Sequence, residues 1–300
     1  MNRVGERHLA AFVVNGARAR GLDRLRARLA LAAAESGWAG PLVLMTTPDD
    51  GGAGMARQAL DAGAALVFAV GGDGTVRACA QVLAGTGVPL AIVPTGTANL
   101  TARSLGVPRD PPAALRAGFG GRNKTIDLAL ADGTISVAMA GIGLDAAVVG
   151  ATPDRLKRHA GWPAYAAASA RHLVARPAEF AIRVDGGREF VRRARSVVVG
   201  NCGLLPGGFP LLPAARPDDG VLDLGILAPA GLADWTSVGY RVLAASHRDD
   251  RRLERYQVRQ VEIRAGQELP RQVDGEMIGP GDSLTVAIQP GALVVRVPGP

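Results

Sequence analysis

The order of hydrophobic and polar positions divides the chain into two parts. In the first part, short apolar runs at 9–14, 42–45, 65–70 and 90–93 are typical of buried parallel strands. Between them, apolar residues recur at helical spacing over about 21–36, 55–62, 76–84 and 100–105. Strict alternation of strands and helices predicts a parallel sheet with helices on its faces. The first part is therefore predicted to be an α/β domain.

After about residue 122 the pattern changes to strands separated by turns rich in Gly and Pro. Helical spacing survives mainly at 156–174 and 232–245. The expected strands are 124–130, 135–140, 180–184, 196–199, 221–227, 257–263 and 284–288. This pattern predicts a β-sandwich or barrel-like second domain. The fold class is thus α/β plus β, with domains at 1–128 and 129–300, and residues near 290–300 could pack back on the first domain.

Length and composition agree with two globular domains and narrow the class of partner. The chain has 300 residues, 48% hydrophobic and 20% charged, which is too long for one core and too apolar for disorder. Aromatic residues are only 4%, which argues against base-stacking surfaces and hence against a nucleic-acid partner. The two cysteines exclude a disulfide framework and a Cys-rich zinc site, and they favour a reducing compartment.

The net charge of +7 comes largely from arginines at 18–28, 188–195 and 248–259. Such a surface suits nucleotides or an anionic membrane leaflet, although a solvated arginine-rich surface explains any one cluster equally well. The sequence shows no signal peptide and no uninterrupted apolar run long enough to span a bilayer. We expect any contact with a membrane to be made from the surface.

A glycine turn, Gly71-Gly-Asp-Gly-Thr75, joins a predicted strand to a predicted helix. This geometry directs backbone N–H groups and a helix N-terminus at an anion, and Gly71, Gly72 and Gly74 place no Cβ in the way. Asp73 could hold a Mg²⁺ that bridges phosphate oxygens. Thr75 can cap the helix or donate to the phosphate. The alternative is an ordinary tight turn with an N-cap.

A second turn, Thr95-Gly-Thr-Ala-Asn99, follows the next predicted strand. Loops at the carboxyl ends of neighbouring parallel strands meet at one crevice of an open sheet. Asp73 and Asn99 could therefore reach the same ligand. Asn99 taken alone is equally well explained as a turn or capping residue.

Further acidic residues stand in apolar or glycine-rich surroundings. Asp127 and Asp145 lie within apolar runs, where a carboxylate must be paired, bound to metal or placed at the edge of an element. In Asp274-Gly275-Glu276 either carboxylate could be a general base for a hydroxyl nucleophile, and an Asp-Gly hairpin turn is the equal alternative. The four histidines have no metal-site spacing and receive no role.

These motifs, in this order, resemble the diacylglycerol kinase catalytic-domain family, the bacterial lipid kinases related to diacylglycerol, sphingosine and ceramide kinases. The resemblance runs nearly end to end, and the glycine turn alone is shared with NAD kinases and phosphofructokinases. The matching segments are Gly71–Thr75, Pro94–Gly106, Lys124–Asp127, Gly141–Ala146, Gly200–Gly203, Pro213–Asp223 and Val273–Glu276.

The resemblance implies an N-terminal NAD-kinase-like α/β domain and a C-terminal β-sandwich, with the active site in the cleft between them. It implies an ATP- and Mg²⁺-dependent kinase that phosphorylates the hydroxyl of a membrane lipid such as diacylglycerol. Such an enzyme is expected in the cytoplasm, peripherally bound to the anionic inner face of the membrane, and a homodimer is possible. The resemblance places ATP against Asn15, Thr46 (alternatively Thr47), Gly71, Gly72, Asp73, Gly74, Thr75, Val76, Arg77, Thr97 and Asn99.

The resemblance also assigns the metal and the base. Asp73 and Asp127 would hold the catalytic Mg²⁺ network, and a structural Mg²⁺ would use the carboxylate of Asp219 with the carbonyls of Arg216 and Val221. The turn at 274–276 would activate the lipid hydroxyl, with Glu276 favoured over Asp274.

Two departures from the family pattern keep other functions open. The first loop is Asn15-Gly-Ala-Arg-Ala19 where many relatives have Asn-Pro-x-Ser-Gly, and Leu100 stands where many have Asp. A non-catalytic nucleotide or lipid sensor would fit these changes. A soluble NAD-kinase-like enzyme would fit the glycine turn, but the block that begins at Pro94 speaks against it.

Overall fold

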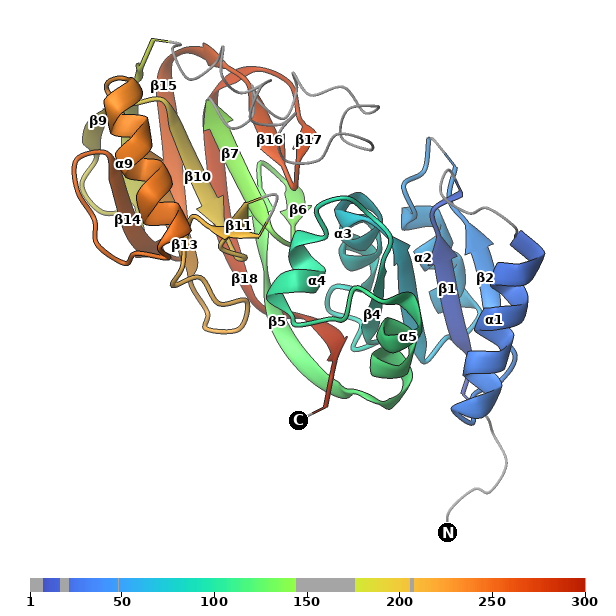
Figure 1. Cartoon of the computed structure of the whole chain (residues 1–300). Coiled ribbons are helices and arrows are strands. Elements are labelled where there is room, and N and C mark those ends of the chain that lie inside the picture. The colour runs from blue at the N-terminus through green and yellow to red at the C-terminus, as the bar shows by residue number, and fades with distance from the viewer. Residues whose placement is uncertain (1–7, 17–21, 48, 144–175, 206–207, 300) are drawn as a thin grey trace. The chain divides into compact units, whose positions relative to one another are not determined.

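The computed structural model describes residues 8–16, 22–47, 49–143, 176–205 and 208–299 (Figure 1). The helix predicted at 156–174 and the acidic residue Asp145 lie outside the described residues. Contacts between Cα atoms divide the chain into two compact units. Unit 1 comprises 1–126 together with 291–300, and unit 2 comprises 127–290.

Unit 1 contains the parallel sheet that the apolar runs predicted. Its strands, in spatial order, are β2 (Leu42–Met45), β1 (Ala10–Val14), β3 (Leu66–Gly71), β4 (Leu90–Pro94) and the end of β18 (Gly281–Val297). All four neighbouring pairs are parallel, including the pair of Val295 with Leu90. β1, β3 and β4 are buried along their whole length, which is why they read as continuous apolar runs.

Unit 1 also contains one helix that the apolar spacing did not reveal. Its helices are α1 (Leu22–Glu35), α2 (Ala53–Asp61), α3 (Asp73–Leu83), α4 (Leu100–Ser104) and α5 (Pro111–Gly120). α5 was not predicted, although its start carries a signal: Asp110 Oδ2 accepts a hydrogen bond from Ala113 N at 3.0 Å, and Pro occupies the first turn. Gly118 lets α5 pack closely, since a Cβ there would overlap the Phe68 ring.

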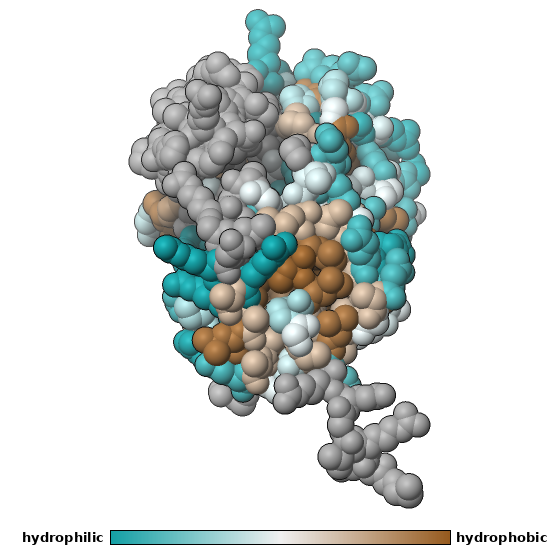
Figure 2. All heavy atoms as spheres, turned by 90° about the vertical axis from the view of Figure 1, so that its right-hand side faces the viewer, coloured by the Kyte–Doolittle hydropathy of each residue, from teal (hydrophilic) through white to brown (hydrophobic). Residues whose placement is uncertain are grey.

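β2 is the edge strand of unit 1 in the part of the chain that the structure describes. Its four apolar residues are each only half-buried. Figure 2 views the side of the molecule that carries α1 and β2, and hydrophobic residues gather in the middle of this face with hydrophilic ones around them. The sheet therefore ends in an apolar edge, the kind that can accept a further strand.

Unit 2 contains two sheets and one described helix. The first sheet joins β6 (Thr134–Ser136) to β5 (Arg122–Ala131), and then β18, β15 (Gln260–Leu269), β8 (Ala178–Val184) and β9 (Phe190–Ala194). The second has the order β14 (Leu253–Val258), β13 (Leu222–Leu227), β10 (Ser196–Gly200), β7 (Met139–Gly143), β16 (Arg271–Val273) and β17 (Glu276–Met277). A small hairpin, β11 (Leu204–Leu205) with β12 (Phe209–Pro210), and α9 (Leu232–Leu243) complete the described part.

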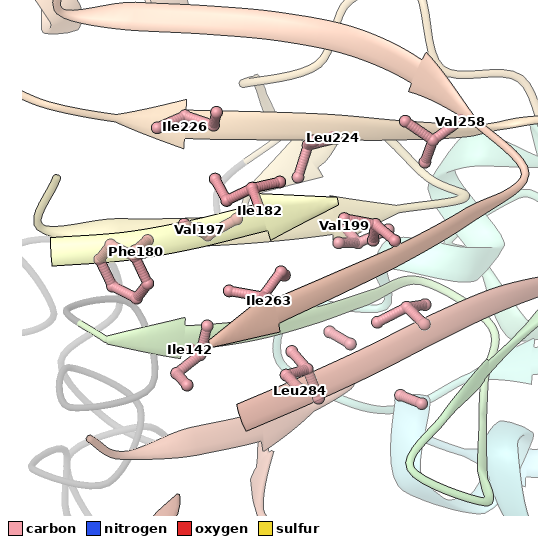
Figure 3. Packing of buried hydrophobic residues seen from close by; sticks show 14 of the residues in the cluster. Ile142, Phe180, Ile182, Val197, Val199, Leu224, Ile226, Val258, Ile263 and Leu284 are labelled. Carbon is pink, nitrogen blue, oxygen red and sulfur yellow. The ribbon is translucent and has the colours of Figure 1, made fainter. Parts of the chain in front are cut away.

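Side chains from both sheets of unit 2 share one hydrophobic core (Figure 3). On β13, Leu222, Leu224 and Ile226 alternate inward, as a strand in a sandwich requires. The residues labelled in Figure 3 are Phe180, Ile182, Ile263 and Leu284 from the first sheet, and Ile142, Val197, Val199, Leu224, Ile226 and Val258 from the second. The β-sandwich prediction is confirmed.

Two of the predicted strands each divide, in the structure, into two strands that belong to different sheets. The run at 135–140 divides into β6 and β7, and the run at 257–263 divides into β14 and β15. At the first division, Val137 and Ala138 are fully buried, so hydrophobicity gave no sign of the corner. At the second, the adjacent exposed residues Arg259 and Gln260 break the alternation and mark it.

Candidate functional site

The two glycine turns of unit 1 touch each other, as the strand order predicted. Thr95 N donates a hydrogen bond to Gly71 O at 2.9 Å, where β3 and β4 end. A Cβ added to Gly72 would lie 3.2 Å from Gly96 Cα. Side chains at these two positions would force the turns apart, so the glycines allow a bare backbone cradle at the carboxyl edge of the sheet.

Asp73 is the first residue of α3, and its carboxylate contacts the first turn of α4. Its Oδ1 accepts a hydrogen bond from Thr101 N at 3.2 Å. Burial raises the pKa of Asp73, and backbone hydrogen bonds from Thr101, Leu100 and Asn99 act in the opposite direction. A cation beside this carboxylate would favour its charged form.

Asn99 uses its side chain within its own turn. Its Nδ2 donates to Gly96 O at 2.9 Å, and its Oδ1 accepts from Gly96 N at 3.0 Å. Its backbone is left-handed, with φ at 48°. In this arrangement Asn99 shapes the turn that faces Gly72.

Of the two roles predicted for Thr75, a helix cap or a donor to the phosphate, the first is wrong. α3 begins at Asp73, so the N-cap is Gly72, and it makes no side-chain capping bond. Thr75 is 4% exposed, and its Oγ1 accepts from Asn15 Nδ2 at 3.5 Å. A Cβ on Gly71 would overlap the Thr75 side chain, which explains why glycine precedes it.

Asn15 and Thr46 come together with Thr75 where β1, β2 and β3 end. Gly16 N donates to Thr46 Oγ1 at 3.3 Å, and Thr46 N donates to Val14 O at 2.9 Å. Thr47 is exposed, and its Oγ1 accepts from Asp50 N at 3.1 Å. The geometry therefore favours Thr46 over Thr47 as the residue beside the first loop.

The remaining residues of the predicted nucleotide site differ in exposure. Val76 is 3% exposed and belongs to the core of unit 1. Gly74 and Arg77 are half-buried, and Thr97 is exposed on the second turn. Val76 therefore presents little to a ligand, since its N–H is also bonded to Gly72 O, whereas Thr97 can present its hydroxyl.

In unit 2 the predicted metal residues gather at one loop. Asp127 N donates to Pro217 O at 2.7 Å, and Asp127 Oδ2 accepts from Gly220 N at 2.8 Å. Asp219 Oδ1 accepts from Val221 N at 3.3 Å. The loop that carries Arg216, Asp219 and Val221 is therefore fastened to Asp127, although these residues are far apart in sequence.

Asp223 is an acidic residue of this region that the sequence analysis quoted only as part of a motif. It is 3% exposed, and its Oδ2 has no hydrogen-bond partner. Burial and the nearby charge of Asp219 raise the pKa of Asp223 to about 6, with Arg255 acting in the opposite direction. Its signal in the sequence was a carboxylate inside the apolar stretch of β13.

An unsatisfied buried carboxylate beside a second one fits a hard cation, which prefers carboxylate and carbonyl oxygens. Among the residues that the structure describes, no three His, Cys, Asp or Glu side chains form a metal-binding group. A cation at this loop would therefore need backbone carbonyls as well as carboxylates.

The third predicted site is the hairpin of β16 and β17. Val273 pairs with Glu276, and the residues between them, Asp274 and Gly275, have φ of 50° and 81°. This is the backbone of a two-residue type I′ turn. Glu276 is exposed, whereas the carboxylate of Asp274 accepts four hydrogen bonds. The two carboxylates therefore have very different surroundings.

The structure divides the arginine clusters into paired and exposed members. Arg192 Nε bonds to Glu254, and Arg252 bonds to Asp234 and Asp250. Arg195 is buried and donates to the carbonyls of Pro229 and Ala230. Exposed arginines in the described part of the last two clusters include Arg188, Arg193, Arg248, Arg251 and Arg259. Only part of each of these two clusters is thus available to an external anion.

Two protein-family models match the chain in sequence. Residues 10–131 match the diacylglycerol kinase catalytic domain, and residues 138–297 match the YegS C-terminal NAD kinase beta sandwich-like domain. A probable lipid kinase YegS-like protein from Pseudomonas fluorescens is 34% identical over 247 residues, which cover 81% of each chain. A diacylglycerol kinase from Bacillus subtilis is 30% identical over 223 residues, covering 72% of this chain and 73% of that protein.

Solved structures share the fold at lower identity. A putative diacylglycerol kinase from Bacillus anthracis has a TM-score of 0.79 at 22% identity and covers 99% of this chain and 98% of its own. An NAD kinase from Archaeoglobus fulgidus, in complex with ATP, has a TM-score of 0.53 at 15% identity and covers 96% and 93%. The fold is thus one that kinases of two substrate classes use. By its sequence, this chain belongs to the family of YegS-like lipid kinases and diacylglycerol kinases.

Membership of this family confirms the resemblance and makes lipid kinase the activity class of the family. Within the described residues, no helix is both long and apolar enough to cross a bilayer.

Proposed function

We propose that this protein transfers the γ-phosphate of ATP to the hydroxyl of a membrane lipid such as diacylglycerol, with Mg²⁺ as cofactor. The observation that carries the proposal is the contact of the two glycine turns beside the half-buried carboxylate of Asp73. Phosphoryl transfer needs little covalent chemistry from the protein and depends on positioning and charge neutralisation. A bare backbone cradle beside an acidic residue meets both needs.

The nucleotide is assigned to unit 1. Backbone N–H groups of 71–75, at the N-terminus of α3, suit the phosphates, because this helix end carries partial positive charge and exposes backbone donors. Asn15, Thr46, Thr75, Thr97 and Asn99 surround or shape the cradle. Arg77, in the second turn of α3, can add a positive charge toward the phosphates.

The metal is assigned to the carboxylates. Asp73 and Asp127 would hold Mg²⁺, which when bound neutralises charge on the transferred phosphate. A second cation would fit Asp219 with the carbonyls of Arg216 and Val221, where the unsatisfied oxygen of Asp223 supplies a further acceptor. This second cation would fasten the loop at 216–221 to which Asp127 is bonded.

The base is assigned to Glu276. Its exposed carboxylate, on a hairpin held by the rest of unit 2, can take the proton of the lipid hydroxyl as the hydroxyl oxygen attacks phosphorus. The bond from phosphorus to the leaving oxygen of ADP breaks as the new one forms, so the phosphate passes directly to the lipid.

The substrate requires contact with a membrane, and α9 supports such a contact. Tyr240 and Leu243 lie on one outward stripe of α9 and are 73% and 68% exposed. Arg248 and Arg251 are exposed just beyond its end. Aromatic and aliphatic side chains beside cations suit the interface of an anionic bilayer, so we propose peripheral binding at the inner, cytoplasmic leaflet.

The test is transfer of radiolabelled phosphate from ATP to mixed lipid vesicles in the presence of Mg²⁺. We expect label in a lipid product, a loss of at least about a hundredfold in rate for Asp73→Asn, and little change for Asp61→Asn, an exposed acidic residue of the same unit. Vesicles without anionic lipid should support a lower rate.

Two outcomes of this assay would contradict the proposal. When NAD is supplied together with the vesicles, label in NAD rather than in lipid would favour a soluble NAD-kinase-like enzyme. Binding of ATP without transfer to any lipid would favour a non-catalytic sensor, which the altered loop at 15–19 and Leu100 would then explain.

A further inference from the structure

We propose that Asp274 is a positioning residue that fastens the β16–β17 hairpin to the strand corner at 136–139 and so places Glu276. It does not itself take the proton. The inference rests on the proposed function, in which Glu276 is the base.

The first argument concerns the corner. The chain leaves the first sheet after β6 and enters the second at β7, and Val137 and Ala138 between them are 0% and 1% exposed. Buried N–H groups at such a corner need acceptors, and leaving one unsatisfied costs about 1–3 kcal/mol. Asp274 supplies them: Oδ2 accepts from Val137 N at 2.9 Å, and Oδ1 accepts from Ala138 N at 2.8 Å and Met139 N at 2.9 Å.

The second argument concerns the acceptor positions of Asp274 that remain for a substrate. Asp274 Oδ1 also accepts from Ser136 Oγ at 2.8 Å, which brings the donors to four. A carboxylate has about four acceptor positions, so little remains for the proton of a hydroxyl. A general base must come within hydrogen-bond reach of that proton. Glu276, two residues further on, is exposed and can do so.

The third argument is that unit 2 uses the same arrangement elsewhere. Asp132-Gly133 and Asp185-Gly186 are also Asp-Gly turns with positive φ at both residues. The carboxylate of Asp185 accepts from Arg259 N at 2.8 Å and Gln260 N at 2.7 Å, and that of Asp132 accepts from Thr285 N at 2.9 Å. In each turn the first residue ties the turn to a segment distant in sequence, which is an anchoring role.

The hairpin is also held from its own side. Gln272 is 4% exposed, and its Oε1 accepts from Gly275 N at 2.8 Å. Asp274 N donates to Met139 O at 2.8 Å. Both turn residues are thus fixed, and the backbone of Glu276 follows directly from them.

The test compares Asp274→Asn, Asp274→Ala and Glu276→Gln in the phosphate-transfer assay. Asn keeps Oδ1, which accepts three of the four hydrogen bonds, tolerates positive φ, and cannot take a proton. We expect Asp274→Asn to remain within about tenfold of wild type and Asp274→Ala to lose about a hundredfold in kcat, as a misplaced group does. Glu276→Gln should lose about 10²–10⁴-fold, and the acidic limb of the pH–rate profile should disappear with it alone.

Hydrogen exchange of the amides of 137–139 provides a readout that does not depend on activity. The amides of Ala138 and Met139, whose acceptor Oδ1 is kept in Asn, should be protected in wild type, Asp274→Asn and Glu276→Gln, and should exchange faster in Asp274→Ala. Asp185→Asn is the matched control, because it changes the same kind of turn elsewhere in unit 2. It should leave both kcat and exchange at 137–139 unchanged.

If Asp274→Asn were as inactive as Glu276→Gln while the amides of Ala138 and Met139 stayed protected, Asp274 would be the base and the inference would be overturned. If the wild type phosphorylates no lipid, the proposed function fails by itself. The exchange data then test the anchoring role of Asp274 without reference to activity. Unchanged protection in Asp274→Ala would refute that role.

Discussion

Gly96 illustrates how one residue sets the distance between two loops of unit 1. A Cβ at this position would lie 2.5 Å from Gly72 Cα and 2.5 Å from Asn99 Oδ1, well inside van der Waals contact. The same turn depends on Asn99, whose left-handed backbone and side-chain bonds to Gly96 fix its shape. Gly96 and Asn99 therefore act mainly through the backbone conformation that they permit.

We predict that Gly96→Ala separates the turns and weakens ATP binding by at least about tenfold, or about 1.4 kcal/mol. Overpacking of this kind usually also costs about 1–3 kcal/mol of stability. Isothermal titration with ATP and thermal unfolding measure the two effects. Gly40→Ala is the control, because a Cβ there meets nothing within 4 Å. ATP affinity equal to wild type in Gly96→Ala would show that the contact of the turns is not needed.

At the scale of elements, α9 is attached to unit 2 by charges as well as by its apolar face. Val238 and Val242 pack into a core cluster with Leu253. Arg252 bonds to Asp234, in the first turn of the helix, and to Asp250, which also bonds to Arg241 near the helix end. The segment before β14 therefore holds both ends of α9.

This network predicts that α9 loosens in acid. The hydrogen bond from Arg252 holds the pKa of Asp234 below its ordinary value of 3.8. Burial acts to raise the pKa of Asp250, but hydrogen bonds from Arg252 and the charge of Arg241 outweigh it and lower the pKa. A lowered carboxyl pKa means stabilisation that is present above about pH 4 and is lost as the pH falls through the lowered value.

Thermal unfolding of wild type and Asp250→Asn between pH 2 and 7 measures this effect. We expect the variant to melt at a lower temperature than wild type at neutral pH, and the difference to disappear in acid. Added salt should narrow the difference at neutral pH, because part of the network is exposed. A constant difference across the whole pH range would mean that the charges do not hold α9.

At the scale of the whole molecule, β18 serves both units. It pairs with β15 in unit 2 and reaches β4 in unit 1 through Val295 and Leu90. In unit 1, Gly85 N donates to Ala292 O at 2.8 Å, and Arg296 Nη1 donates to Gly121 O at 2.6 Å. The last ten residues are therefore part of the first unit, although the chain has crossed the second to reach it.

We predict that deletion of 291–300 unfolds unit 1 under native conditions. Leu293, Val295 and Val297 are each at most 3% exposed, and burying such side chains contributes about 1.5–3 kcal/mol apiece. Their sum is comparable with the whole stability of a typical domain. Limited proteolysis should then cut within 8–126 first, whereas deletion of 299–300 alone should leave the digestion pattern of wild type. A truncated chain with full protease resistance in unit 1 would refute the prediction.

The sequence by itself determined the parallel sheet and the meeting of its two glycine turns. Both depend on local signals: continuous apolar runs give buried strands, and alternation with helices brings the carboxyl ends of β3 and β4 to one edge. The sandwich was predicted from the many strands separated by turns rich in Gly and Pro, of which β13 is one. The start of α3 was misplaced, because a glycine N-cap without a side chain leaves little trace in the sequence.

Only the tertiary structure decided which segments of the chain each carboxylate is hydrogen-bonded to. Asp274 and the corner at 136–139 are more than 130 residues apart, and Asp127 is 93 residues from Gly220. Such pairings depend on where a chain leaves one sheet for another, and a fully apolar corner such as Val137-Ala138 carries no mark of it. A sequence identifies acidic residues able to act, but hydrogen bonds between distant segments decide which of them is an anchor and which stays exposed for chemistry.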